Sequence, residues 1–169
     1  RSYNPTFIMR NFYFHQGGRD AGWEYRIGKI TPDQILVTSK YINPNTTFLP
    51  NGGTGIFTNA YPDSGLGVAG ALHFNDLVSL GGVISDANGD RYNLGDITQG
   101  QFYSAAELNV KIAPRTPDAG YSKFLIWHSD GTSDGSAVNG STGRPGWGFS
   151  FKLEQELDAE GRAILIGRY

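Results

Sequence analysis

The lengths of the connections between strand-like segments constrain this chain most. Eight segments rich in aromatic and β-branched residues, each bounded by Gly, Pro, Asn or Asp, are predicted to be strands: 6–16, 22–30, 65–74, 77–85, 102–113, 120–129, 146–157 and 162–169. The connections between them alternate strictly between short (17–21, 75–76, 114–119 and 158–161) and long (31–64, 86–101 and 130–145). The alternation predicts an all-β, antiparallel, up-and-down arrangement with short turns at one end and long loops at the other.

Three segments alternate cleanly between polar and apolar residues with a period of two. In 103–112 one face carries Tyr103, Ala105, Glu107, Asn109 and Lys111, and the other carries Ser104, Ala106, Leu108, Val110 and Ile112. In 147–156 the aromatic residues share one face and Lys152, Glu154 and Glu156 share the other, and 23–28 behaves in the same way. Each strand therefore has one face toward an apolar medium and one toward water. Segments 6–16, 77–85 and 120–129 alternate too poorly for their faces to be assigned.

Composition limits the class of protein. The 169 residues are enough for one domain, so 1–169 is expected to be a single unit with no internal boundary. The 24 glycines and 13% aromatic residues favour strands and turns. The absence of Cys excludes disulfides and thiolate metal sites, and a net charge of −2 without a basic block argues against nucleic-acid binding.

Strands of about ten residues with this loop layout are typical of an outer-membrane β-barrel, in which periplasmic turns are short and extracellular loops are long. The chain has no run of about 18 apolar residues, so a transmembrane helix is not expected. Asn75-Asp76 and 158–161 are predicted to be tight hairpin turns. The expected location is the cell outer membrane.

The stretch ISDANGDRYN, 84–93, raises the question of a calcium loop. An EF-hand loop needs Gly at its sixth position and Glu at its twelfth. Counted from Asp86, these positions hold Arg91 and Ile97. A polar loop that leaves a strand is the better interpretation, with calcium binding by 86–101 left open, and no metal site is predicted.

The chain also resembles a known family through an ordered series of segments. GWEYRIGKITP, NTTFLPNGG, YPDSGLG, GGVISDANGDRYN, FYSAAELNV, LIWHSDG and GWGFSFKLEQELD…GR…GRY resemble the carbohydrate-selective (OprB-type) porins in the same order, over nearly all of the chain. The resemblance implies a single-chain outer-membrane barrel of about sixteen strands that passes sugars by passive, selective diffusion, without a cofactor.

The chain departs from that family in length, because it holds only about eight strands. It is therefore expected to be a piece of a larger porin or a small eight-stranded barrel, whose interior would be filled by side chains and make a poor pore. Sugars are the expected permeants and outer-membrane lipid the expected surroundings, and the oligomeric state stays open.

The candidate pore-lining residues are polar residues that can exchange hydrogen bonds with sugar hydroxyls, and an aromatic residue that can stack on a sugar ring. They are Glu24, Arg26, Glu107, Lys111, Lys152 and Glu154, with Arg10, Trp127 and His128 as weaker candidates. The alternative is that these charges only solvate the wall and pair across strands. Loop 31–64 is expected either to fold over the pore or to pack at the surface.

Catalysis and a soluble fold are the competing interpretations. Glu154 and Glu156 are neighbours on one strand face and do not form the cleft that glycoside hydrolysis needs. His128, Ser129 and Asp130 are consecutive and point in different directions, and no nucleophile elbow, P-loop or zinc signature is present. We therefore expect no enzyme activity. A secreted, lectin-like β-sandwich that binds glycans is the runner-up, although it does not explain the alternating connections.

Overall fold

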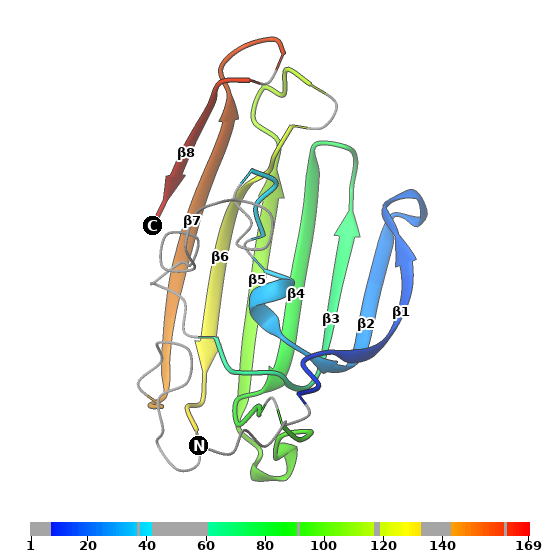
Figure 1. Ribbon diagram of the computed structural model, residues 1–169, viewed down its shortest axis with the longest axis vertical. Coiled ribbons are helices and arrows are strands. Elements are labelled where there is room, and N and C mark those ends of the chain that lie inside the picture. The colour runs from blue at the N-terminus through cyan, green and yellow to red at the C-terminus, as the bar shows by residue number, and fades with distance from the viewer. Residues whose placement is uncertain are drawn as a thin grey trace, which may run out of the picture.

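The computed structural model describes residues 8–36, 38–41, 61–90, 92–116, 119–132, 143–160 and 162–169. The chain forms one eight-stranded antiparallel sheet in which the strands follow one another in sequence order (Figure 1). The strands are β1 (Phe12–Gly18), β2 (Trp23–Ile30), β3 (Gly65–His73), β4 (Val78–Asp86), β5 (Phe102–Val110), β6 (Ser122–Ser129), β7 (Gly146–Glu156) and β8 (Ile164–Arg168). All eight predicted strands are confirmed, and the first begins at Phe12 rather than at residue 6.

The two ends of the sheet differ in the length of their connections (Figure 1). At one end a 3-10 turn, η1 (Arg19–Ala21), joins β1 to β2, and a tight turn joins β3 to β4. The predicted turn at Asn75-Asp76 is confirmed, because Oδ1 of Asn75 accepts the backbone N–H groups of Leu77 at 2.8 Å and Val78 at 2.9 Å. The long connections leave and rejoin the sheet at the opposite end, where η3 (Ile97–Gln99) precedes β5.

The sheet is open. β1 and β8 lie at its two edges and do not pair with each other, so the closed eight-stranded barrel, one of the two expected alternatives, is not formed. The described residues contain 3-10 turns but no α-helix, and none of their helical segments is long and apolar enough to cross a membrane.

One face of the sheet, called the apolar face here, is covered by exposed hydrophobic side chains. The pairing register places these side chains on the same face of all eight strands. Their exposed fractions lie between 36% and 78%, in Phe12, Phe14, Trp23, Ile27, Val68, Leu72, Leu80, Ile84, Phe102, Leu108, Phe124, Ile126, Trp147, Phe149, Phe151 and Leu165. The faces predicted for 23–28, 103–112 and 147–156 are confirmed by this register.

The opposite face, called the polar face here, carries charged and small residues and is partly covered by the connection after β2. This connection begins with η2 (Pro32–Gln34), and the buried side chain of Leu36 joins Val83, Tyr103 and Leu125 in the core cluster. Residues 31–36 and 38–41 of loop 31–64 lie over this face of the sheet (Figure 1), a position that fits both alternatives for the loop. Residues 37 and 42–60 lie outside the described residues.

Candidate functional site

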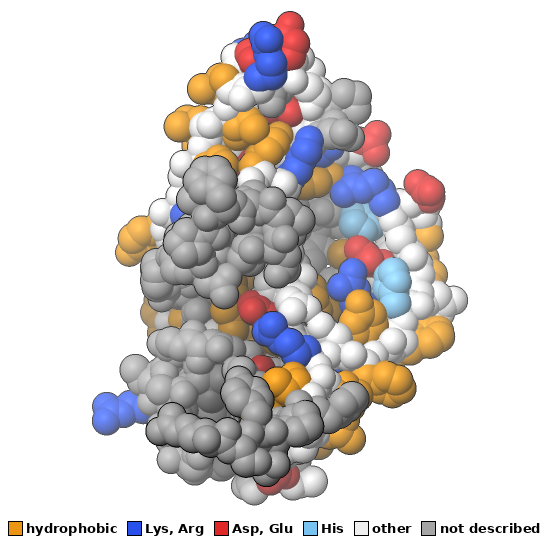
Figure 2. Space-filling view, in the orientation of Figure 1, with side chains coloured by type: hydrophobic (Ala, Val, Ile, Leu, Met, Phe, Trp, Pro, Cys, Tyr) orange, Lys and Arg blue, Asp and Glu red, His pale blue; other side chains and the backbone are white. Residues whose placement is uncertain are grey.

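The polar face brings acidic, basic and histidine side chains together, as Figure 2 shows. On β5 to β7 the register places Lys123 directly opposite Lys152. Each ammonium group has its own carboxylate: Lys123 Nζ lies 3.0 Å from Glu107 Oε1, and Lys152 Nζ lies 2.8 Å from Glu154 Oε1. The paired carboxylates offset the repulsion that two facing lysines would otherwise cause.

These charges also hold the described segment 38–41, called the strap here. Lys123 donates to the hydroxyl of Thr38 at 3.0 Å, and Lys152 donates to its carbonyl at 2.5 Å. The hydroxyl of Ser39 donates to Glu154. Charge-assisted hydrogen bonds of this kind are among the stronger ones in proteins, so the strap is fixed over β6 and β7.

The end of the strap is fastened at Glu156, the last residue of β7. Tyr41 donates its hydroxyl to Glu156 at 3.0 Å, and the backbone N–H groups of Arg115 and Thr116 donate to the same carboxylate at 3.0 and 2.8 Å. Burial raises the pKa of the Tyr41 hydroxyl, and its hydrogen bond to Glu156 acts in the same direction. The phenol therefore stays protonated at neutral pH and keeps its role as donor.

A second charged group lies on the same face at β1 to β3. Glu24 sits between two imidazoles, with His15 Nε2 at 3.0 Å and His73 Nε2 at 3.3 Å, and Arg26 lies 3.9 Å away. The contact between Glu24 and His73 is an ion-pair distance and not a hydrogen bond, and neither ring nitrogen of His73 has a hydrogen-bond partner among the described residues. The described residues hold no cluster of three or more His, Asp or Glu side chains suited to a metal ion.

Two cavities lie between these groups. The first, of about 300 Å³, lies between the start of the β2–β3 connection and the sheet, and its lining includes Glu24, Arg26, Glu107 and Lys123. The second, of about 660 Å³, lies toward the short-turn end, and its lining includes Lys111 and Glu154. Both cavities are lined by Arg19, Thr38, Tyr121 and Lys123, so they are neighbours along one face.

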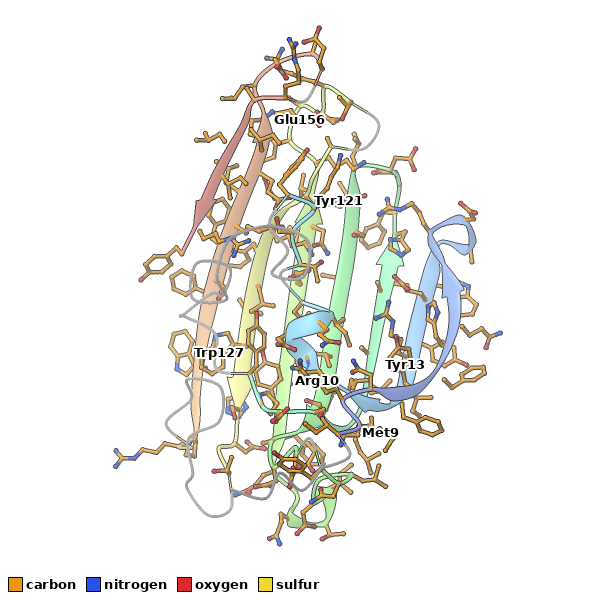
Figure 3. The ribbon with its side chains drawn as sticks, viewed as in Figure 1. Met9, Arg10, Tyr13, Tyr121, Trp127 and Glu156 are labelled. Carbon is orange, nitrogen blue, oxygen red and sulfur yellow. The ribbon has the colours of Figure 1, made fainter. Side chains whose placement is uncertain are left out.

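Tyr121 stands where the two cavities meet (Figure 3). The guanidinium carbon of Arg19 lies 5.3 Å from its ring centroid, and Nζ of Lys111 lies 5.1 Å from it. Both distances are within the range of cation–π attraction, about 6 Å. The ring thus holds two cations near the short-turn end of the polar face.

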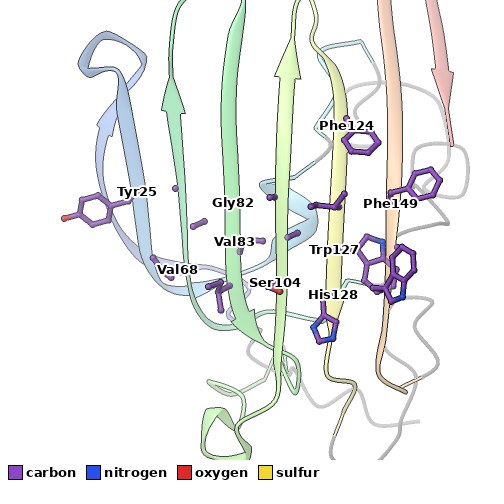
Figure 4. A pocket seen from close by; sticks show the side chains of 17 residues that line it. Tyr25, Val68, Gly82, Val83, Ser104, Phe124, Trp127, His128 and Phe149 are labelled. Carbon is purple, nitrogen blue, oxygen red and sulfur yellow. The ribbon is translucent and has the colours of Figure 1, made fainter.

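A larger cavity lies elsewhere, on the apolar face (Figure 4). Its volume is about 860 Å³, and it opens where the register aligns the small residues Gly70, Gly82 and Ala106 across three strands. Phe124, Ile126, Phe149 and other apolar side chains surround it. A hydroxyl-rich ligand would find few hydrogen-bond partners there, so we assign the candidate polar ligand site to the other face.

The six stronger sequence-predicted site residues separate into three groups. Glu24, Arg26 and Glu107 line the 300 Å³ cavity, and Lys111 and Glu154 line the 660 Å³ cavity. Lys152 also lies on the polar face, but it is 0% exposed, enclosed by Glu154 and the strap.

The three weaker candidates lie away from these two cavities. His128 is on the apolar face, because the register sets it opposite Ser104 and Trp147, so its expected position on the polar wall is wrong. Trp127 is on the polar face, but its ring stacks against that of Tyr103, with the ring centroids 6.4 Å apart, and lies over Gly148. Arg10 precedes β1, and its carbonyl accepts a hydrogen bond from the Thr31 hydroxyl at 3.1 Å.

Sequence reasoning missed three residues of the polar face. Lys123 belongs to a segment with poor alternation, and its role depends on the β5–β6 register, which sets it opposite Asn109. The alternation in 103–112 puts Asn109 on the same face as Glu107, and this pattern could have identified Asn109 as a residue of the site. His73 ends β3 and lines the 300 Å³ cavity, and no pattern in the sequence indicates this.

The loop after β4, for which calcium binding was left open, is held by a lysine side chain. The ammonium group of Lys29, a fully buried residue of β2, donates to the carbonyl of Asp90 at 2.7 Å and to the carbonyl of Asn93. Within the loop, the carboxylate of Asp90 accepts the backbone N–H of Tyr92 at 2.8 Å, as in an Asx turn. The loop that raised the calcium question is thus bound by a side-chain cation, through two of its backbone carbonyls.

Replacing Lys29 by Met is expected to loosen this loop selectively. The methionine keeps the apolar stem but leaves the two carbonyls without their donor, at a cost of about 1–3 kcal/mol. Amide hydrogen exchange should become faster at 92–96 and stay unchanged in the middle of β4. Equal exchange rates at 92–96 in the variant and the wild type would contradict this role.

The polar face thus presents donors and acceptors around two cavities, an arrangement suited to binding hydroxylated solutes. Comparison of the chain with protein-family models, with curated proteins and with solved structures gives no match.

Proposed function

We propose that the chain is part of the wall of an outer-membrane porin that passes carbohydrates by passive, selective diffusion. The proposal takes the sugar and the family from the sequence resemblance to carbohydrate-selective porins. The observation that carries it is the opposition of the two faces: one sheet has an exposed hydrophobic face and a polar face with buried charges. This arrangement is the reverse of a soluble sheet, whose hydrophobic face packs into the core.

The size of the apolar face supports a lipid environment. Exposed hydrophobic side chains occur on all eight strands of the sheet, whereas contiguous apolar patches on soluble monomers are limited to a few hundred Å². In a bilayer these side chains would face acyl chains, and the polar face would line an aqueous interior. The free edges of β1 and β8 are suited to pairing with further strands that close a wider barrel.

Three measurements test the proposal. The protein isolated from its native membrane without heating should have an intact mass well above that of this chain, with peptides that extend past Tyr169. Reconstituted in planar bilayers, that protein should give stepwise ion conductance, and liposomes that contain it should swell in isosmotic glucose. A protein that stays monodisperse in buffer without detergent and gives no conductance would favour the lectin-like alternative.

Substitutions of opposite sign at the polar face should shift ion selectivity in opposite directions. Arg26→Gln removes a cation beside Glu24, and Glu107→Gln removes an anion while keeping an oxygen for Lys123. The first should make the pore more cation-selective and the second more anion-selective, because fixed charge in a narrow pore attracts counterions. Reversal potentials in a salt gradient measure the selectivity. Unchanged reversal potentials in both variants would mean that neither side chain lines the narrow part of the pore.

A further inference from the structure

We infer that the 300 Å³ cavity on the polar face is a binding subsite for a single monosaccharide ring, with His73 and Asn109 as its direct hydrogen-bond partners. The choice of a sugar as ligand rests on the proposed function, and the subsite adds residues that the sequence did not indicate. The inference stands on the cavity's shape and on unpartnered polar atoms in its wall.

The shape comes from small residues beneath an apolar cover. Ala69, Ala71 and Gly81 occupy neighbouring positions on β3 and β4 and leave the space open. Ile35 and Leu36, from the connection after β2, lie across it. The volume is at the low end of small-molecule sites, about 300–1,000 Å³, which suits one sugar ring better than an oligosaccharide.

The polar wall is a single row across four strands. The register aligns His73 with Ser79, Ser79 with Asn109, and Asn109 with Lys123. Lys123 is already paired with Glu107, whose Oε1 lies 3.0 Å from its ammonium group. Glu24 and Arg26 reach the cavity from the other side.

Two members of this row have unmet hydrogen-bonding capacity. The side chain of His73 is 9% exposed; its Nδ1 has no hydrogen-bond partner among the described residues, and its Nε2 lies 3.3 Å from Glu24 Oε1 without forming a hydrogen bond. Asn109 is also 9% exposed, and the described part of the chain offers its Oδ1 no donor. Leaving a buried polar atom without a partner is unfavourable, so a ligand that supplies the missing hydrogen-bond partners gains affinity.

A sugar ring fits both requirements of this cavity. Each hydroxyl both donates and accepts, so adjacent hydroxyls can serve an imidazole nitrogen and an amide oxygen together. The C–H face of a pyranose is apolar and can lie against Ile35 and Leu36. The 860 Å³ cavity fits less well because it is apolar. In the wall of the 660 Å³ cavity, Glu154 accepts from Lys152 and Ser39 through Oε1, which leaves its Oε2 without a partner among the described residues, but that oxygen belongs to a carboxylate already engaged by Lys152 and the strap.

The test uses the protein from its native membrane in detergent micelles, with D-glucose as the probe. Imidazole signals are followed by NMR, and those of this chain come from three histidines, His15, His73 and His128. The His73 signals should shift and saturate with glucose, while those of His128, on the apolar face, should stay in place. No response at His73, or a response equal to that at His128, would overturn the inference.

Two variants distinguish specific binding in this cavity from nonspecific contact with the sugar. Asn109→Leu removes the unpartnered amide, and Gly81→Val fills the cavity at a position where an added Cβ meets only ordinary contacts, the nearest at 3.7 Å. Each should weaken the glucose response of His73 by about tenfold or more, because a hydrogen bond or the space itself is lost. Gly146→Val is the matched control, since an added Cβ there meets no atom within 4 Å and Gly146 is not part of the cavity lining.

Conductance distinguishes failure of the subsite from failure of the proposed function. A protein that conducts and passes glucose while both variants keep the wild-type glucose response at His73 would overturn the subsite and leave the pore intact. A protein that does not conduct but shows the saturable His73 response, lost in both variants, would support the subsite and overturn the porin proposal.

Discussion

An arginine at Ile126 is expected to destabilise the protein in a lipid bilayer by about 2–4 kcal/mol, the cost of a basic side chain on the lipid face near the membrane centre. Ile126 lies in the middle of β6 on the apolar face, between Ala106 and Phe149, and is 53% exposed. The free energy of unfolding is measured by urea titration in vesicles with tryptophan fluorescence. If Ile126 faced water instead of lipid, the substitution would change the free energy of unfolding by no more than about 0.5 kcal/mol.

Tyr92→Arg is the matched control for this substitution. Tyr92 is 59% exposed, a similar fraction, but it lies in the loop after β4 and outside the strands. Arginine there should leave the free energy of unfolding unchanged within about 0.5 kcal/mol. Equal effects of the two substitutions would contradict a lipid-facing role for the apolar face.

Removing the carboxylate of Glu154 has the second large expected effect. Glu154→Leu leaves the ammonium group of Lys152 without its counter-charge, and both side chains of this ion pair are 0% exposed. Breaking one partner of a buried ion pair costs about 3–5 kcal/mol. The unfolding free energy of the variant should fall by that amount, and the strap should lose its hydrogen bond from Ser39.

The double variant Lys152→Met/Glu154→Leu is the control for this prediction. With both charges gone, no ion is left buried without a partner, and apolar replacements of similar volume are often neutral. Most of the lost stability should return in urea titration. A double variant no more stable than Glu154→Leu would show that Glu154 acts through the strap contacts and not through Lys152.

The sequence predicts the strands and their faces where one face is consistently polar. β5 and β7 alternate cleanly, so Glu107 and Glu154 were placed on the correct face before the register was known. β6 could not be assigned, because its polar-face positions include Leu125, which is fully buried, and Trp127 beside it. Because β6 has apolar residues on both faces, its sequence does not alternate between polar and apolar residues. The pattern therefore does not indicate that Lys123 lies on the polar face and His128 on the apolar face.

The contacts of the strap could not be predicted in the same way. Tyr41 and Glu156 are 115 residues apart, and their hydrogen bond exists only because the connection after β2 folds back over the sheet. No local pattern encodes such a contact, since its partners are set by the register of strands that come later in the chain. The unmet hydrogen-bonding capacity of His73 and of Asn109 Oδ1 likewise depends on which neighbours the fold places beside these atoms.

The Lys29 ammonium among the carbonyls of the loop after β4 has a consequence for how that loop responds to its surroundings. A calcium loop loses its shape when chelators or dilution remove the ion. Here the cation is tethered covalently to β2, so its effective concentration at the loop is fixed once the strand pairs and does not follow the ionic composition outside. The loop should therefore keep its shape in EDTA and in calcium-free medium alike.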